Sequence, residues 1–398
     1  MLSSVPEKDR TYKTLFGGVF ATFADDKLIK NKNVDYICRG EGEEAVMEMC
    51  KKLCSADRID NVRNFTLKVD GQIYRNPLRP AVDLDTVPIP DWDLFDPGSI
   101  CRPMQGKIWR CVGFETQRGC PYTCTYCNSP GNNVIYKEEG NRIFHRKKSI
   151  KRIKQELDSL VKKYDPELIY FVVDTFLAMS HKEFDEFKEM YMDYKIPFWM
   201  NTRAETITEH RAEGLEEMNM LRTSIGLEHG NAEYRQKVIL KGFDNQMMID
   251  ATQMLYDAGI PISINNIIGF PGETRSLIFD TIELNRKLKG IDTTNVAIFA
   301  PFHGTPLRKL CLDMGYIKDS FIPGTLNTTI TLKNISNLPG YELEGLRKTF
   351  AMYSRMPKKY WGKLKKAERN DKQGNLLFKE LAEIYTEKYF GSGSAESN

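Results

Sequence analysis

The segment that decides the fold is residues 119–127, which read Gly-Cys-Pro-Tyr-Thr-Cys-Thr-Tyr-Cys. Its cysteines, Cys120, Cys124 and Cys127, have the spacing C-x3-C-x2-C, and Tyr126 stands directly before the last of them. Three thiolates this close together suit three irons of a 4Fe–4S cluster, because soft sulfur ligands favour iron–sulfur chemistry. A fourth cysteine at matching spacing is absent. One iron therefore keeps an open position, which the amine and carboxylate of a small molecule can fill.

Two other readings of the cysteines stay open. A structural zinc site is the first, but zinc prefers four ligands in paired C-x2-C units, and the nearest histidine is His145. A group of buried thiols without a metal is the second. The spacing favours the cluster, since it is more specific than a single C-x-x-C.

The segment resembles the cluster-binding loop of the radical S-adenosylmethionine (SAM) enzymes. The resemblance implies that the open iron binds the amino and carboxyl groups of SAM. One electron from the reduced cluster would then cleave SAM to methionine and a 5′-deoxyadenosyl radical, which abstracts a substrate hydrogen. It also implies that Tyr126 packs beside the cluster and contacts adenine. An aromatic ring at this point keeps solvent away from a reactive intermediate.

Composition limits the class of protein. A chain of 398 residues predicts roughly two or three domains. The formal net charge of +3 argues against a nucleic-acid protein held by bulk charge. We expect a cytoplasmic protein without a membrane span, because the sequence has no long apolar run and no signal-peptide core. Nine cysteines are too few and too irregular for a disulfide scaffold.

Apolar strands alternate with amphipathic helices from residue 108 onward, and alternating βα units predict a parallel sheet. Six units favour an α/β fold with a partial (β/α)6 barrel. We expect Ser149 and Asp244 to cap two of its helices. Four regions follow: a partial cobalamin-binding-like domain over 1–76, a Pro-rich linker over 77–107, a radical SAM core over 108–306 and a helical C-terminal region over 307–398. The candidate strands are Val112–Thr116, Leu168–Val173, Pro197–Met200, Thr223–Leu227, Ile262–Ile268 and Asn295–Phe299.

Polar residues follow these strands, where the chemistry of a parallel barrel lies. By resemblance to the core motifs of the family, the Gly-Leu-Glu228 step and the turn from Gly269 to Glu273 serve SAM. Gly269 would let the backbone approach adenine. His303 is a candidate acid/base or substrate group. For each polar residue the alternative is a helix cap or a loop ion pair, and no catalytic residue is identified. The other candidate SAM contacts are Asp174, Asn201 and Arg203.

Residues 17–54 resemble the second half of a cobalamin-binding Rossmann-like domain, and Gly17 and Gly18 match its glycine-rich turn. This chain has Phe20 where the family turn often carries histidine. The segment upstream of the turn is missing, so we expect a truncated domain with a long unpaired sheet edge. We therefore expect the chain as given to bind cobalamin poorly.

The expected function is that of a radical SAM enzyme of the cobalamin-dependent type, which transfers methyl groups to unactivated carbon or performs related radical chemistry. The alternatives are a cobalamin-independent radical SAM enzyme for hydrogen abstraction or cyclisation, and a non-enzymatic cluster or cobalamin sensor. The expected cofactors are a 4Fe–4S cluster, SAM and cobalamin. The expected partners are a small-molecule or peptide substrate and an electron donor such as flavodoxin or ferredoxin. The sequence does not identify the substrate.

Overall fold

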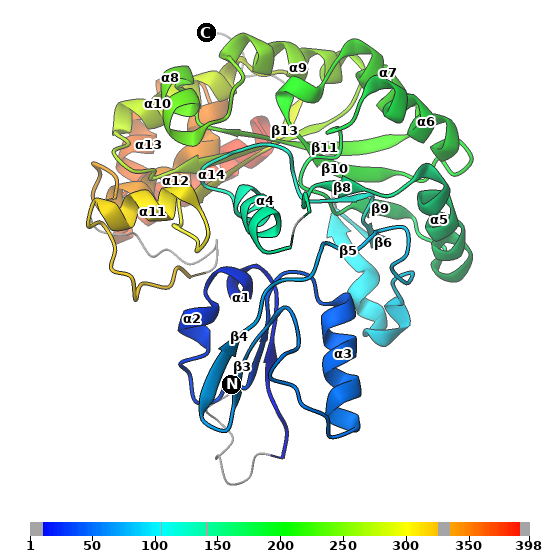
Figure 1. Cartoon of the computed structure of the whole chain (residues 1–398). Helices are drawn as coiled ribbons and strands as arrows, with labels where there is room; N and C mark the ends of the chain where they lie inside the picture. The colour runs from blue at the N-terminus through cyan, green and yellow to red at the C-terminus, as the bar shows by residue number, and fades with distance from the viewer. Residues whose placement is uncertain (1–10, 105, 141, 325–334, 391–398) are drawn as a thin grey trace.

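The computed structural model describes residues 11–104, 106–140, 142–324 and 335–390. Its largest sheet has seven strands in the order β13-β12-β11-β10-β9-β6-β5 (Figure 1). Six of these strands, namely β6 and β9 to β13, run parallel to one another. Strand β5 pairs with β6 antiparallel at one edge of the sheet. Their bounds are β5 (Cys101–Met104), β6 (Lys107–Phe114), β9 (Leu168–Phe171), β10 (Phe198–Thr202), β11 (Met220–Glu228), β12 (Ile262–Ile268) and β13 (Ile291–Ile298).

The six parallel strands confirm the expected partial barrel, which appears as a curled half-barrel sheet. Strand β5 lies inside the segment expected to be only a linker. It tolerates Pro103 because an edge strand needs no ladder hydrogen bond on its outer side. The connector without regular strands therefore ends before Cys101, earlier than the expected boundary at residue 107.

Helices cover the outer face of the sheet, while α4 (Ser129–Glu138) lies on the opposite, inner side (Figure 1). Ser149 and Asp244 cap two outer helices as expected, accepting hydrogen bonds from the backbone N–H groups of Arg152 and Met247. The outer helices are α5 (Ile150–Tyr164), α6 (His181–Tyr191), α7 (Glu209–Glu217), α8 (Ala232–Tyr234), α9 (Asn245–Asp257) and α10 (Arg275–Lys287).

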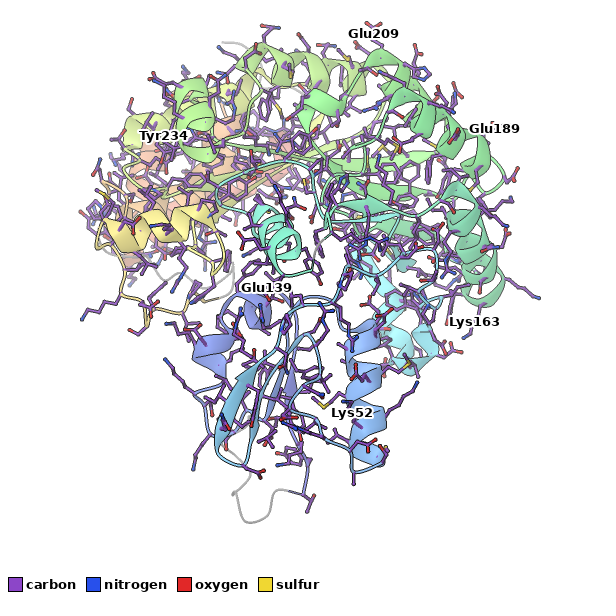
Figure 2. All side chains as sticks on the ribbon, viewed as in Figure 1. Lys52, Glu139, Lys163, Glu189, Glu209 and Tyr234 are labelled. Atoms are coloured by element: carbon purple, nitrogen blue, oxygen red, sulfur yellow. The ribbon has the colours of Figure 1, made fainter. Side chains whose placement is uncertain are left out.

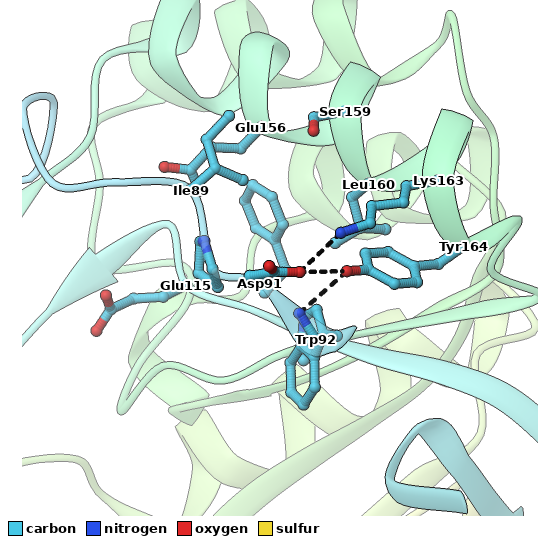
Figure 3. A pocket seen from close by; sticks show the side chains of 12 residues that line it. Ile89, Asp91, Trp92, Glu115, Glu156, Ser159, Leu160, Lys163 and Tyr164 are labelled. Carbon is cyan, nitrogen blue, oxygen red and sulfur yellow. Dashed lines mark hydrogen bonds and ion pairs between the residues drawn. The ribbon is translucent and has the colours of Figure 1, made fainter. Parts of the chain in front are cut away.

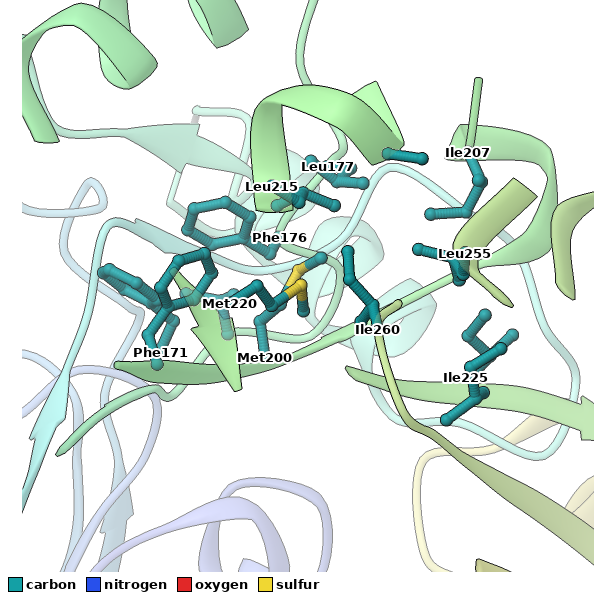
Figure 4. Packing of buried hydrophobic residues seen from close by; sticks show 14 of the residues in the cluster. Phe171, Phe176, Leu177, Met200, Ile207, Leu215, Met220, Ile225, Leu255 and Ile260 are labelled. Atoms are coloured by element: carbon teal, nitrogen blue, oxygen red, sulfur yellow. The ribbon is translucent and has the colours of Figure 1, made fainter. Parts of the chain in front are cut away.

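The main hydrophobic core fills the space between the sheet and these outer helices. Figure 4 shows Phe171, Met200 and Ile225 from three neighbouring strands packing near Leu215 and Leu255 from the helices. Side chains alternate along a strand. The residues next to these core positions therefore point to the inner face, where the carboxyl ends of the strands form a rim.

The C-terminal region is helical, as expected. It contains α11 (Pro306–Asp313), α12 (Gly340–Arg355), α13 (Trp361–Ala367) and α14 (Lys372–Lys388). Leu346 and Phe350 of α12 pack with Ile278 and Ile282 of α10 in a second core. None of the helices in the described ranges is long and apolar enough to span a bilayer.

Residues 11–76, here called the front unit, form a four-stranded sheet in the order β1-β2-β3-β4. Strands β1 and β2 are parallel, and β3 and β4 form an antiparallel hairpin that pairs with β2. This hairpin was not predicted from the sequence; it covers the edge of β2 that would otherwise be exposed. The elements are β1 (Leu15–Phe16), α1 (Val19–Phe23), α2 (Asp25–Leu28), β2 (Tyr36–Cys38), α3 (Glu43–Cys54), β3 (Phe65–Val69) and β4 (Gln72–Arg75).

A buried carboxylate, Glu41, ties the front unit to the core. It accepts a hydrogen bond of 2.6 Å from Arg118 and another from Arg146. Both arginines belong to a two-stranded sheet formed by β7 (Gln117–Arg118) and β8 (Arg146–Lys147). Because β7 directly precedes the cysteine loop, the front unit is anchored close to it.

Candidate active site

The cysteine loop lies between β7 and α4, at the carboxyl rim. Gly119 adopts φ = 84°, and a Cβ there would lie 2.8 Å from the ring of Phe144. Only glycine fits this position without strain. The loop is also held by Thr125, whose N–H donates to the Ile239 carbonyl at 3.0 Å and whose carbonyl accepts from Leu307 N–H at 3.0 Å.

Each of the three cysteine sulfurs has a polar neighbour. Cys120 Sγ lies 3.5 Å from the Thr175 hydroxyl, and Cys127 Sγ accepts a hydrogen bond of 3.4 Å from the Ser129 N–H. Cys124 Sγ accepts a hydrogen bond of 2.9 Å from the guanidinium of Arg203. Hydrogen bonds to the sulfurs are a normal second layer around an iron–sulfur cluster.

Burial raises the pKa of the Cys120 and Cys127 thiols. Metal binding overcomes this effect, because a coordinating thiol is deprotonated. Within the described ranges, no three His, Cys, Asp or Glu side chains lie close enough to share one metal ion. In a cubane cluster each thiolate binds a different iron, so its ligands need not approach a common point. The donor set fits such a cluster.

Glu228 ends β11 in an unusual backbone conformation. Its φ is 64°, and the pairing of β11 with β12 shifts register between Gly226 and Glu228. Its Oε1 accepts hydrogen bonds of 3.0 Å from the Tyr126 hydroxyl and 3.1 Å from Lys241 Nζ. Burial, followed by the charge of Glu228, raises the pKa of Tyr126 well above its usual value, so the phenol remains a donor. The structure thus brings Tyr126 and Glu228 together.

Lys241 is a site residue that the sequence analysis missed. Its side chain is only 3% exposed, and its contact with Glu228 crosses 13 residues of chain. It follows a π-helical turn (Arg235–Ile239) and Leu240, which has φ = 53°. No sequence periodicity marks such a turn, so nothing in the sequence indicated where the lysine would point.

The other strand-end candidates have separate partners. Asp174 accepts a hydrogen bond of 2.6 Å from the hydroxyl of Ser129, at the start of α4. Asn201 donates to the Tyr170 hydroxyl at 3.0 Å, and the Tyr170 ring stacks on Trp199 with 4.4 Å between centroids. Asp174 therefore lies beside the cysteine loop, whereas Asn201 lies on the inner face of the sheet.

The turn from Gly269 to Glu273 is stabilised by hydrogen bonds between its own residues. Glu273 Oε2 accepts hydrogen bonds from the N–H groups of Gly269 and Phe270, and its Oε1 lies 3.0 Å from His229 Nε2. The side chains of Glu273 and His229 are fully buried. Gly269 has φ = 82°, and a Cβ there would meet Leu343 at 3.3 Å. The left-handed backbone alone requires glycine at this turn.

His303 lies where the front unit meets the rim. Its ring contacts Phe20 edge-on, with 5.3 Å between centroids, and a Cβ on Gly304 would lie 2.3 Å from the Phe23 ring. Neither ring nitrogen has a hydrogen-bond partner among the described residues. Burial, then the charge of Arg308, lowers the pKa of His303 to about 4, so the imidazole is neutral at pH 7.

Gly17 and Gly18 lie in the exposed turn before α1. Gly18 has φ = 87°, with open space where a Cβ would be. The left-handed backbone by itself explains why residue 18 is glycine, so no contact with a ligand is needed to account for it. Its contact with cobalamin stays a prediction.

A cavity of about 230 Å³ lies away from the cysteine loop (Figure 3). Asp91 in its wall accepts hydrogen bonds of 2.7 Å from Lys163 and 3.1 Å from the Tyr164 hydroxyl. The wall combines the proline-rich connector, β6 and α5, and includes no cysteine. The cavity belongs to the packing of the connector against the outer helix layer.

The radical SAM superfamily model matches residues 114–284. An uncharacterized methyltransferase of Pyrococcus horikoshii is 28% identical over 358 residues, which cover 86% of this chain and 72% of that protein. The anaerobic magnesium-protoporphyrin IX monomethyl ester cyclase of Rubrivivax gelatinosus is 26% identical over 314 residues, which cover 76% of this chain and 53% of the cyclase.

Among solved structures, the cobalamin-dependent SAM radical enzyme OxsB, with aqua-cobalamin and SAM bound, matches with a TM-score of 0.63. The identity is 15%, and the match covers 94% of this chain and 58% of OxsB. This likeness establishes the fold. The sequence match spans the cysteine loop and most of the strands behind it. The region that contains the cysteine loop, residues 114–284, is thus similar to the radical SAM superfamily, and the whole chain has the fold of a radical SAM enzyme.

Proposed function

We propose that the chain is a cobalamin-dependent radical SAM enzyme that transfers a methyl group to an unactivated carbon. The observation that carries the radical SAM part is the arrangement at the rim. Three thiols with polar neighbours adjoin the partly buried Tyr126, which is hydrogen-bonded to the buried pair of Glu228 and Lys241. In this proposal Cys120, Cys124 and Cys127 hold a 4Fe–4S cluster, which supplies the electron that cleaves SAM.

Glu228 and Lys241 are the proposed SAM contacts. Among the described residues both hydrogen bonds to Glu228 reach Oε1, so Oε2 can accept from a ribose hydroxyl or an ammonium group. Lys241 uses one donor on Glu228 and has further donors for the SAM carboxylate. Since both side chains are buried, these charge-assisted bonds form in a site of low dielectric constant and are strong.

The aromatic side chains limit water at this point. Tyr126 packs in a cluster with buried Ile239, Phe270 and Phe299. Its ring meets Phe270 edge-on, with 6.2 Å between centroids. A dry wall beside the open iron protects a radical from quenching by solvent. Asp174, held by Ser129, is placed to orient a polar group of SAM or of the substrate.

The cobalamin part of the proposal rests on the front unit and the relatives. The glycine turn and α1 contact the rim through Phe20 and Phe23. The Pyrococcus relative is named a methyltransferase, and OxsB is a cobalamin-dependent enzyme. Cobalamin, when bound, supplies the methyl group. A small-molecule or peptide substrate and a low-potential electron donor complete the proposed reaction.

A cobalamin-independent cyclisation is the second candidate. The Rubrivivax relative, whose match covers 76% of this chain, is named a cyclase, and this name supports cyclisation without bearing on cobalamin. In addition, Phe20 stands where the family turn often carries histidine, and its ring packs on His303. The phenyl ring of Phe20 has no donor atom for cobalt, so residue 20 would not hold cobalamin as a histidine would.

Anaerobic reconstitution tests the proposal in two stages. The first measures iron and sulfide content and the release of 5′-deoxyadenosine from SAM with a chemical reductant. Protein that binds iron stoichiometrically and cleaves SAM supports a radical SAM enzyme, and folded protein that does neither contradicts it. The second measures binding of hydroxocobalamin by equilibrium dialysis. Stoichiometric binding supports the cobalamin-dependent methyltransferase, and its absence in SAM-cleaving protein favours the cobalamin-independent candidate.

A further inference from the structure

The guanidinium of Arg203 is aimed at one cluster sulfur. Its Nη1 donates to Cys124 Sγ at 2.9 Å, and its central carbon lies 3.8 Å from the centroid of the Tyr122 ring. Arg203 is 6% exposed, so its charge acts in a low dielectric medium. The position of Arg203 after a strand predicts a contact with SAM, whereas its Nη1 donates to the Cys124 sulfur.

The three cysteine sulfurs differ in the charge of their neighbours. A hydroxyl adjoins Cys120 and a backbone N–H donates to Cys127, and both groups are neutral. Cys124 faces a cation. The structure therefore places an asymmetric positive charge beside one ligand position.

Glu205 forms an ion pair with this cation. Arg203 donates to Glu205 Oε1 from Nε at 2.8 Å and also from Nη2. The other oxygen, Oε2, is buried without a hydrogen-bond partner in the described part of the chain. An unsatisfied buried carboxylate oxygen is costly, so its retention here requires a reason. Holding Arg203 against Cys124 while offsetting part of its charge is such a reason.

We propose that Arg203 raises the reduction potential of the cluster through Cys124, and that Glu205 limits the increase. When one electron passes from a low-potential flavin or iron–sulfur donor to the cluster, the cluster gains one negative charge. A cation and a hydrogen bond at the ligand sulfur stabilise this reduced state relative to the oxidised one. The inference rests on the proposed cluster, and it assigns Arg203 as a positioning residue rather than a SAM ligand.

The test is an anaerobic redox titration of the reconstituted full chain, followed by the electron paramagnetic resonance signal of the reduced cluster. Iron and sulfide content of wild type is measured first, because failure to bind a cluster would contradict the proposed function itself. We expect Arg203→Met to lower the ratio of reduced to oxidised cluster about tenfold at a fixed potential, equivalent to about 59 mV for one electron. Arg203→Lys, which keeps the charge, should recover part of this loss.

Glu205→Gln provides the opposite change. It keeps Arg203 but removes the countercharge, so the midpoint potential should rise. Arg211→Met is the matched control, since Arg211 is also a buried arginine of this region but donates to backbone carbonyls of Leu177 and Thr206. Its midpoint should equal that of wild type.

Unchanged midpoints in cluster-loaded Arg203→Met and Glu205→Gln proteins would overturn the inference. A large loss of SAM affinity in Arg203→Met at an unchanged midpoint would also overturn it, and would restore Arg203 as a SAM contact. If Arg203→Met does not retain a cluster, the midpoint potential of Glu205→Gln decides between the outcomes. A rise above wild type supports the inference, and an unchanged or lower midpoint overturns it.

Discussion

The Nη2 atom of Arg39 lies 2.8 Å and 2.9 Å from the two carboxylate oxygens of Glu139, one hundred residues later in the chain. Arg39 follows β2 of the front unit, and Glu139 directly follows the helix α4, which begins next to the cysteine loop. Figure 2 labels Glu139 at the boundary between the two parts. The front unit is thus connected by a charged contact to the helix that carries the site.

Arg39→Met should destabilise the protein by about 3 kcal/mol, the low end of the range for breaking a buried pair. The Arg39 side chain is 1% exposed, and its loss leaves Glu139 with the longer contact of 3.4 Å to the half-exposed Arg75. Chemical denaturation measures the free energy of unfolding. Arg58→Met is the control, because the Arg58 side chain is 80% exposed in its pair with Asp60, so its loss should change the free energy of unfolding far less. Equal losses in the two variants would contradict the importance of the buried pair.

Alanine at Cys120, Cys124 or Cys127 should remove the cluster, because each thiolate is expected to hold a different iron. Iron and sulfide counts and the visible absorbance of reconstituted protein measure this loss. Cys111→Ala is the matched control, since Cys111 is also buried but belongs to β6, before the loop. If a variant with alanine at all three of these cysteines keeps its iron, the ligand assignment is wrong.

Glu228→Gln should weaken SAM binding by about 1–3 kcal/mol, the cost of a lost charge-assisted hydrogen bond in a buried site. Titration calorimetry of the cluster-loaded protein measures the dissociation constant, and the melting temperature is recorded beside it. Glu233→Gln, on the exposed face of α8, is the control. Lost stability with unchanged SAM affinity would show that Glu228 serves the fold instead.

His303 should make the folded protein sensitive to acid. Its pKa is lowered by burial to about 4, from an ordinary value of about 6.5. Between these values the unfolded chain binds a proton that the folded protein does not. The stability associated with neutral His303 is therefore present above about pH 6.5 and is lost as the pH falls toward 4. His303→Gln should lose less stability over this range, as measured by the free energy of unfolding at several pH values. Identical profiles for the two proteins would count against the lowered pKa.

The sequence by itself determined the local features of this protein. The spacing of the cysteines predicts the cluster loop, and hydrophobic periodicity located the six parallel strands of the half-barrel. Ser149 and Asp244 cap their helices as expected, because a cap needs only a hydrogen bond to a backbone group three residues away. These features depend on neighbouring residues, so a short stretch of sequence contains the information.

Only the tertiary structure decided which side chains meet at the site. Lys241 reaches Glu228 through a π-helical turn, and Arg203 reaches Cys124 across 79 residues. The hairpin of β3 and β4 and the edge strand β5 were also missed, because their pairing depends on where a sheet edge lies in space. The strength and direction of a polar contact depend on burial and on distant partners. The residue types therefore suggested a SAM site, while the fold alone assigned Lys241 to Glu228 and Arg203 to the thiol.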